Sequence, residues 1–409
     1  MNDDDGVLAP EHWATRLGVP VLIFAPHVVA LLRLNDLVPL IDADHQVMRV
    51  YAVPDNGEDR PDAAELVRAD GGVLLTMPQV RRVTHGLVLA GSTRGVDDVL
   101  GPVLLVPHGG GLGQYRPHRT DTDGALVTGL HPAQLMRDGR VRPDRIALTH
   151  EREWDLLARI CPEALPHAFV GGDIAFDRLV ATAEYRDQHR RALGVTDDRE
   201  VLLVTSTWSP LSGFGRNPEL FREIAEALPR DRFRVVASLH PQIWSQHGTG
   251  QVLGWLSDAI DAGLRVLKPY TDWRGAVAAA DHVLADYTSL GTFAAGLGTP
   301  VLRLPHGPQP LLEGSPAAVL AEHTPRWDPT RPLLPQLRAA ADAQGRGLGA
   351  RIAGLLTSRP GEAGKILRKE MYDLLGLPEP ARAVPLSPAP LPRLVPRPVI
   401  PRPRSRPDG

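Results

Sequence analysis

The stretch that most constrains the fold is HVLADYTSLGTFAAGLGTPVLRLP, which occupies residues 282–305. It contains an apolar run, a polar turn, an Ala-rich segment closed by a glycine, and a second apolar run, at 283–285, 286–289, 290–298 and 300–304. Short apolar runs bounded by turn residues predict buried strands, and the Ala-rich segment predicts a helix between them. A strand, a helix and a second strand form the unit from which parallel sheets are built, so this stretch predicts an α/β fold.

The polar turn of this unit places Thr288 and Ser289 at the start of the predicted helix. The free N–H groups and the dipole at a helix N-terminus favour an anion, and short hydroxyl side chains add hydrogen-bond donors. Ser and Thr also dominate the helix-capping position, so the turn considered alone favours a simple N-cap at Ser289. The turn therefore leaves two interpretations open, an anion site and a cap.

The bulk properties of the chain exclude several classes of protein. Its 409 residues are enough for two domains, and 43% of them are hydrophobic. A net charge of −3 gives no electrostatic reason to expect nucleic acid as a partner. Cys161 is the single cysteine, which excludes an intrachain disulfide and a cysteine-based zinc site. The start, MNDDDGVLAPEHW, lacks the apolar core of a signal peptide, and no apolar run approaches the ~20 residues of a membrane helix. We therefore expect a cytoplasmic protein with at most peripheral membrane contact.

Apolar runs that predict strands recur along the chain, with helix-length segments between them. The first series covers 21–24, 47–53, 72–76, 87–89, 103–106, 146–149 and 168–170, and the second covers 201–205, 233–239, 265–267, 283–285 and 300–304. Short buried strands separated by helices are typical of doubly wound α/β domains. We therefore expect two Rossmann-like domains, at 1–180 and 181–358, followed by an amphipathic C-terminal helix at 359–377.

The composition changes abruptly at Pro378. The last 32 residues contain 11 Pro and six Arg, with almost no aromatic or acidic residues. Such a segment buries too little apolar surface to offset the entropy lost on ordering it. The sequence therefore predicts a disordered Pro/Arg-rich tail at 378–409, partly in the polyproline II conformation.

The motif VPHGGGLG, at 106–113, follows a predicted strand of the first domain. Ligands of open α/β sheets bind at the carboxyl ends of the strands. His108 is therefore placed to act as a general base, and Gly109, Gly110 and Gly111 allow the backbone to approach a ligand. An HGGG loop is also typical of lipases, but their G-x-S-x-G motif is absent, as are the dinucleotide and P-loop motifs. A purely structural glycine-rich turn is the alternative.

Three strands of the second series also end in polar residues. The sequence TSTW, at 205–208, follows one strand, His240 follows the next, and Thr288 and Ser289 follow the strand at 283–285. Because the carboxyl ends of parallel strands meet at one edge of a sheet, we expect these hydroxyl groups and the imidazole to converge on one crevice. Together these residues favour a ligand site, although none of them does so alone.

The sequence gives little reason to expect a metal ion. The D-x-D motifs at 42–44 and 121–123 match a metal motif of some sugar transferases, but a chain with this many aspartates contains about two such matches by chance. The remaining histidines show no spacing typical of metal ligands. We therefore expect neither a metal nor a cofactor.

Several of these motifs together resemble the CDP-glycerol glycerophosphotransferase family, whose members polymerise or prime teichoic acids and have the GT-B fold. The resemblance covers residues 100–305 and rests on Pro107-His108-Gly109, G-D-x-x-x-D-R-L at 172–179, T-S-T-W at 205–208, H-P at 240–241, A-D at 280–281, D-Y-T-S at 286–289 and Pro300. A segment similar to 172–179 also occurs in the nonhydrolysing UDP-N-acetylglucosamine 2-epimerases, which share the fold. The resemblance implies two domains that face each other across a cleft, with the helix at 360–375 packed back against the first.

The resemblance also implies an activity, namely metal-independent transfer of a glycerophosphoryl or glycosyl group from a nucleotide-diphosphate donor to a hydroxyl acceptor. His108 would deprotonate the acceptor, beside an acceptor loop formed by Gly109, Gly110 and Gly111. His240 would act with the donor-binding residues to hold the donor and to stabilise charge on the departing nucleotide. The donor-binding residues are Thr207, His240, Asp286, Thr288 and Ser289.

The sequence departs from the family pattern at three points. Ser209 stands where the family has Arg, His108 is followed by G-G-G-L-G instead of G-T, and Leu239 stands where a basic or polar residue is usual. These departures leave the donor open between CDP-glycerol and a nucleotide sugar. Two other functions stay open as well: a UDP-N-acetylglucosamine 2-epimerase, and a nucleotide-binding protein that has lost the chemistry.

Overall fold

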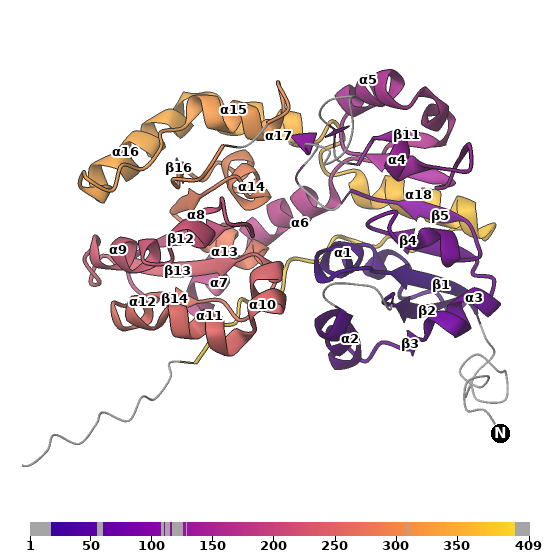
Figure 1. The fold of residues 1–409 in the computed structure, drawn as a ribbon, viewed down its shortest axis with the longest axis horizontal. Coiled ribbons are helices and arrows are strands. Elements are labelled where there is room, and N and C mark those ends of the chain that lie inside the picture. The colour runs from indigo at the N-terminus through magenta and orange to yellow at the C-terminus, as the bar shows by residue number, and fades with distance from the viewer. Residues whose placement is uncertain are drawn as a thin grey trace, which may run out of the picture.

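The computed structural model of the protein describes residues 18–54, 60–107, 110, 115–116, 126–127, 129–308 and 311–396. Within these residues the chain forms two parallel sheets, each covered by helices, which lie side by side (Figure 1). The first sheet is drawn in indigo to magenta, and the second in magenta to orange. The expected pair of Rossmann-like domains is therefore confirmed.

The first domain is built on a parallel sheet with the strand order β11-β10-β5-β4-β1-β2-β3. Alternate residues of its interior strand β1 belong to separate cores, Val21 and Ile23 to one and Leu22 and Phe24 to the other. The sheet is therefore buried on both faces, which explains its short, continuous apolar strands. These strands are β1 (Val19–Phe24), β2 (Val47–Ala52), β3 (Leu74–Leu75), β4 (Leu87–Ala90), β5 (Val103–Leu105), β10 (Arg145–Leu148) and β11 (Ala168–Val170).

The helices of the first domain connect and cover these strands. They are α1 (Val28–Leu34), α2 (Arg60–Ala69), α3 (Met77–Arg82), α4 (Pro132–Leu135) and α5 (Glu151–Ile160), with short 3₁₀ turns at Val38–Leu40, Val96–Asp98 and Pro162–His167. Two small antiparallel sheets accompany the main one, β6 (Tyr115–Arg116) with β7 (Leu126–Val127), and β8 (Met136–Arg137) with β9 (Arg140–Val141). The β8–β9 turn was missed in the sequence, although its Asp138-Gly139 pair, with φ of 48° and 75°, is a strong hairpin signal.

The second domain is built on a parallel sheet with the order β14-β13-β12-β15-β16. The strands are β12 (Glu200–Ser206), β13 (Phe233–Leu239), β14 (Arg265–Val266), β15 (His282–Ala285) and β16 (Val301–Arg303). The direction of strand succession reverses between β12 and β15, and in open α/β sheets such a reversal opens a ligand crevice at the carboxyl ends. The polar residues after β12 and β15 are therefore at the place where this fold binds ligands.

The helices of the second domain lie on both faces of its sheet (Figure 1). They are α7 (Arg186–Ala192), α8 (Gly213–Arg216), α9 (Leu220–Glu226), α10 (Pro241–His247), α11 (Thr249–Trp255), α12 (Ser257–Asp261), α13 (Arg274–Ala279), α14 (Ser289–Leu297), α15 (Pro316–His323), α16 (Leu333–Ala343) and α17 (Gly349–Leu356), with a π-turn at Gln344–Leu348. No helix in the described part of the chain is both long and apolar enough to span a membrane.

Two helices connect the domains. The first, α6 (Ile174–Ala183), begins at Asp173, whose carboxylate caps two N–H groups of the first turn, and its Phe176 packs into the second-domain core. The second, α18 (Ala363–Leu375), returns to the first domain, where Leu367 is part of the core. The chain therefore crosses to the second domain along α6 and returns to the first between α17 and α18.

The prediction of a disordered tail is wrong for residues 378–396. In Figure 1 this yellow segment leaves α18, passes beside α1 and reaches the edge of the second sheet at β14. There the Val395 N–H donates a hydrogen bond to the Val266 carbonyl at 2.8 Å, and Leu394 forms an antiparallel bridge with Leu267. The segment therefore extends the sheet beyond β14. We call residues 378–396 the C-terminal strap.

The strap is also held along its middle by α6. The Arg178 Nε donates to the Ser387 carbonyl at 3.2 Å, and the Ala389 N–H donates to the Thr182 hydroxyl at 2.9 Å. Apolar burial is not the main source of stability for this segment, so its composition is a poor guide to its order. Backbone hydrogen bonds to an open sheet edge supply the missing stabilisation, and proline lowers the entropy that the unfolded segment can lose. Residues 397–409 lie outside the described residues.

Candidate functional site

Asp286 organises the carboxyl ends of β12 and β15. It is 4% exposed, and its oxygens accept hydrogen bonds from the Ser206 hydroxyl at 2.7 Å and from the N–H groups of Thr207, Gly213 and Thr288 at 3.0, 3.0 and 3.1 Å. Burial raises the pKa of Asp286, and these hydrogen bonds oppose the rise. The carboxylate expected to contact a donor is thus engaged inside the protein, where it holds the turns that carry the site.

Thr288 and Ser289 occupy the N-terminus of α14, as the sequence predicted. Thr288, rather than Ser289, is the N-cap, since its side chain accepts a hydrogen bond from the Leu290 N–H at 3.3 Å. The N–H and hydroxyl of Ser289 have no hydrogen-bond partner within the part of the chain that the structure describes. The first turn of α14 therefore presents donors, together with the positive end of the helix dipole, to whatever lies before it.

His240 follows β13 and caps α10. Its Nδ1 accepts a hydrogen bond from the Gln242 N–H at 3.2 Å. A ring nitrogen that accepts a hydrogen bond carries no proton, so the neutral imidazole has its proton on Nε2. His240 also lines the adjoining cavity, so its imidazole is placed to contact a ligand there.

His240, Thr288 and Ser289 line one cavity of about 560 Å³, which lies between the two domains and which we call the cleft cavity. Its first-domain wall comes from α1 and α2, and its second-domain wall comes from residues 268–274 and the starts of α10 and α14. The volume is within the range typical of small-molecule sites. The structure thus brings together three of the five residues expected to bind a donor, whereas Thr207 and Asp286 are not among the residues that line the cavity.

Gly110, which follows β5 in the chain, approaches the same place from the first domain. A Cβ atom built on Gly110 would lie 3.2 Å from the Phe293 ring and 3.4 Å from the Ser289 Cβ, so the Gly110 backbone lies directly against the start of α14. This close approach explains a glycine at this position. Of the expected acceptor-side residues, His108, Gly109 and Gly111 lie outside the described residues.

A buried network of charges joins the domains beneath the cleft cavity. Asp36 of the first domain accepts hydrogen bonds from Arg178 on α6 and from Arg274 on α13, and Arg274 also pairs with Asp272 at 2.9 Å. Asp36 is 2% exposed and Arg274 is 5% exposed. Buried ion pairs of this kind are costly to break because each partner would be left uncompensated. We call Arg33, Asp36, Asp173, Arg178, Asp272 and Arg274 the interdomain charge network.

Arg33 connects this network to the acceptor-side loop. Its Nη2 pairs with Asp173 at 3.0 Å, and its Nε donates to the Pro107 carbonyl at 2.8 Å. Pro107 is the residue immediately before His108. The network therefore holds the end of the strand from which the expected base emerges.

Tyr270 marks a strained point in the cleft wall. Its φ is 61°, in the left-handed region that residues other than glycine, Asn and Asp rarely adopt. The ring packs against hydrophobic cores of both domains, and the residue lines the cleft cavity. Backbone strain of this kind persists only where surrounding contacts enforce it, and it is commonest at ligand sites.

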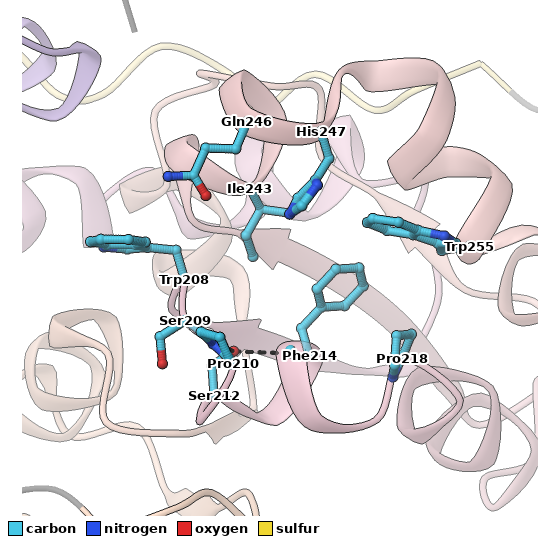
Figure 2. Close-up of a pocket in the computed structure, with 11 residues that line it drawn as sticks. Trp208, Ser209, Pro210, Ser212, Phe214, Pro218, Ile243, Gln246, His247 and Trp255 are labelled. Carbon is cyan, nitrogen blue, oxygen red and sulfur yellow. Dashed lines mark hydrogen bonds between the residues drawn. The ribbon is translucent and has the colours of Figure 1, made fainter. Parts of the chain in front are cut away.

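A second cavity, of about 460 Å³, lies within the second domain (Figure 2). Figure 2 shows Trp208 and Trp255 on opposite sides of it, with Phe214 and Ile243 between them. This cavity adjoins the cleft cavity. Trp208 lines the former and His240 the latter, and their ring centroids are 6.4 Å apart. We place the candidate site in the cleft cavity because the imidazole, the hydroxyls and the helix N-terminus meet there.

Ser209, where the resembled family has Arg, lines the second cavity. Its hydroxyl is 2.7 Å from the Tyr287 hydroxyl, and it accepts a hydrogen bond from the Leu211 N–H at 3.0 Å. The Tyr287 ring meets His306 edge-on at a centroid distance of 5.1 Å. Ser209 therefore shapes the turn after β12 and carries no charge toward a donor.

The architecture is shared with proteins of known structure. A variant of the wall teichoic acid polymerase TagF aligns with a TM-score of 0.58 at 11% identity, over 87% of this chain and 89% of that one. The chain has the GT-B fold. A structure assigned to a UDP-N-acetylglucosamine 2-epimerase from Listeria monocytogenes aligns with a TM-score of 0.54 at 14% identity, over 89% of this chain and 99% of that one. The MnaA–UDP complex from S. aureus aligns with a TM-score of 0.50 at 13% identity, over the same shares.

The motifs suggested two families, and a structure from each shares the architecture of this chain. These similarities confirm the fold that the motif resemblance implied. No protein-family model and no curated protein matches the sequence. Within the described residues, no group of three or more His, Cys, Asp and Glu side chains is placed to hold a metal ion. The GT-B cleft is thus the structural setting in which the candidate residues have to be interpreted.

Sequence reasoning missed part of this cleft. The interdomain charge network and the cleft-lining residues Lys268, Tyr270 and Arg393 were not anticipated. Asp173 and Arg178 belong to the motif at 172–179, but the other members are single charged residues far apart in the chain and carry no local pattern that would mark them. The turn that holds Tyr270 offered a weak signal, because Lys268-Pro269 follows a strand at the edge where ligands bind.

Proposed function

We propose that the protein transfers a glycerophosphoryl or glycosyl group from a nucleotide-diphosphate donor to a hydroxyl acceptor in the cleft. The observation that carries this proposal is that His240, Thr288 and Ser289, from two separate strand ends, line a single interdomain cavity. A helix N-terminus, hydroxyl groups and an imidazole N–H suit a diphosphate, because together they compensate its charge. The UDP complex of S. aureus MnaA, which has this fold, supports a nucleotide as the ligand.

The acceptor oxygen would form its new bond to phosphorus in glycerophosphoryl transfer, or to the anomeric carbon in glycosyl transfer. The bond that breaks joins that atom to a phosphate oxygen of the nucleotide, which leaves with the electron pair. His240 Nε2–H and the first turn of α14 would stabilise the charge that develops on this leaving group. The acceptor proton would pass to His108, a role that the approach of Gly110 to Ser289 supports.

The cleft offers less to an epimerase. That chemistry needs carboxyl groups able to exchange a proton with a sugar carbon. Asp36 and Asp272, two of the three carboxylates that line the cleft cavity, are paired with arginines of the interdomain charge network. We therefore favour group transfer over epimerisation.

Calorimetric titration and a turnover assay with CDP-, UDP-, GDP- and dTDP-linked compounds test the proposal. His240→Asn is the informative variant, because Asn still caps α10 while the Nε2 donor is lost. We expect it to fold normally and to slow transfer by about 10²-fold, the usual cost of one lost transition-state donor. His45→Asn, at an exposed position in the first domain, is the matched control.

Two results would overturn the proposal. One is that none of these compounds binds the full chain. The other is that the His240 and His45 variants turn over the best donor equally fast, since the cleft would then not be the reaction site.

A further inference from the structure

The C-terminal strap contributes directly to the cleft. Pro390, Leu391 and Arg393 line the cleft cavity, although the sequence composition of this segment predicted disorder. The Arg393 carbonyl accepts a hydrogen bond from the Lys268 N–H at 2.8 Å. Pairing with the edge of the second sheet therefore holds Arg393 beside Lys268, on the cleft wall that also includes the start of α14.

The arginines and the lysine that line the cleft cavity fall into two groups. Arg33, Arg178 and Arg274 are neutralised by Asp36, Asp173 and Asp272 in the interdomain charge network. The side chains of Lys268 and Arg393 are exposed and make no hydrogen bond or ion pair with any residue that the structure describes. The remaining carboxylate, Asp70, lies at the end of α2 on the opposite wall.

We infer that Lys268 and Arg393 form a phosphate-binding pair, so that the C-terminal strap is part of the ligand site. Two neighbouring cations without a counter-ion repel each other, and an anion between them removes that cost. Arg offers a planar fork that matches two phosphate oxygens, and Lys adds a point charge. The helix N-terminus on the same wall strengthens the local positive field.

The inference rests on the proposed function in one respect: it assumes that the bound phosphate belongs to a substrate of group transfer. Two sources share this chemistry, the diphosphate of a nucleotide donor and a phosphate carried by the acceptor. Both would bring a doubly or singly charged phosphate to the second-domain wall. The probes below separate them.

Arg393→Gln tests the pair, because it removes the charge and leaves the backbone bond to Lys268 in place. Arg382→Gln is the matched control, since Arg382 is an exposed arginine of the same strap that contributes only its carbonyl to α18. The full chain and both variants are titrated with inorganic pyrophosphate, CDP, UDP, glycerol 3-phosphate and the nucleosides cytidine and uridine. Loss of one charge-assisted contact should weaken phosphate-bearing probes by about 10-fold or more in Kd.

The expected result is weaker binding of pyrophosphate by the Arg393 variant, with Arg382→Gln unchanged and partial recovery in Arg393→Lys. A parallel loss for CDP or UDP assigns the pair to the donor, whereas a loss confined to glycerol 3-phosphate assigns it to the acceptor. Equal affinities of the Arg393 and Arg382 variants for every phosphate-bearing probe would overturn the inference. Absence of nucleotide binding by the full chain would contradict the proposed function alone, because pyrophosphate still tests the pair.

Discussion

Arg274 of the second domain donates a hydrogen bond to the carboxylate of Asp36 in the first, and both side chains are buried. Burial lowers the pKa of Arg274, but Asp36, Asp272 and Asp173 raise it by more, so the pKa lies above its usual value. The guanidinium is therefore charged in the folded protein. This contact ties the two walls of the cleft together beneath the cavity, so that the mutual position of the domains and the shape of the site depend on it.

Asp36→Asn should strongly destabilise the protein. The variant keeps the shape of the side chain but leaves Arg178 and Arg274 without the carboxylate that compensates them, which typically costs about 3–5 kcal/mol at a buried pair. Urea denaturation measures the free energy of unfolding of the wild type and the variant. Asp42→Asn is the control, because Asp42 pairs with Arg49 at 2.6 Å in a partly exposed position, where a loss below about 1 kcal/mol is expected. Equal effects of the two variants would show that the network is not structural.

Removal of residues 378–409 should lower the melting temperature. The truncated chain loses the backbone bonds of Val395 and Arg393 to the second sheet, and the contact of Ser387 with Arg178. At a net contribution of about 1 kcal/mol for each hydrogen bond, a shift of several degrees follows. A chain that ends at Pro396 keeps all of these contacts and serves as the control. A melting temperature unchanged by the longer truncation would contradict the packing of the strap.

Much of the fold could be predicted because its signals are local. Apolar runs such as 201–205 and 233–239 coincide with β12 and β13, and turn residues mark where they end. The strap could not be predicted in this way. Its stability comes from the open edge of β14, whose position exists only after the sheet has formed.

Ser289→Ala and His108→Ala should separate donor binding from catalysis. Ser289 lines the cleft cavity at the start of α14, so loss of its hydroxyl should weaken the best nucleotide by about 10-fold. His108→Ala should leave that affinity unchanged and reduce turnover by about 10²–10⁴-fold, the usual contribution of a general base. Ser257→Ala, at a partly exposed position on α12, controls for loss of a hydroxyl elsewhere. If His108→Ala weakens nucleotide binding as much as Ser289→Ala, His108 is a donor ligand instead of a base.

The protein should lose stability in mildly acidic solution, partly through His85. This side chain is fully buried, and burial lowers its pKa, although a hydrogen bond to the Leu100 carbonyl opposes the shift. Below pH ~6.5 the unfolded chain binds a proton that the folded chain resists, so stability is greatest above that pH and falls as the pH drops toward the folded pKa. The slope for one such group is at most about 1.4 kcal/mol per pH unit.

His85→Leu should make this pH dependence shallower. The free energy of unfolding is measured with urea between about pH 5 and 7.5, the range in which histidine side chains titrate. His189, whose pKa burial also lowers, keeps contributing in the variant, so the slope should decrease without vanishing. His45→Gln at an exposed position should leave it unchanged. An identical slope in the wild type and in His85→Leu would rule out His85 as its source.

The candidate site was only partly visible in the sequence. His240, Thr288 and Ser289 were found because each follows an apolar strand, and parallel topology sends such strand ends to one edge. Asp286 was found as well, but with a different role from the one expected. Its four hydrogen-bond donors come from three separate turns, and no local pattern reveals that they converge on one carboxylate.

The order of short apolar runs and turns was sufficient to establish two doubly wound sheets and the strand ends at which a ligand would bind. Those features follow from periodicity and from the geometry of parallel strands, which act over a few residues. The tertiary structure alone decided that Arg274 meets Asp36, that Arg33 holds Pro107, and that Arg393 lines the cleft. Each of these contacts joins segments distant in the chain, and a charged residue has no preferred partner until folding excludes water and brings one within reach.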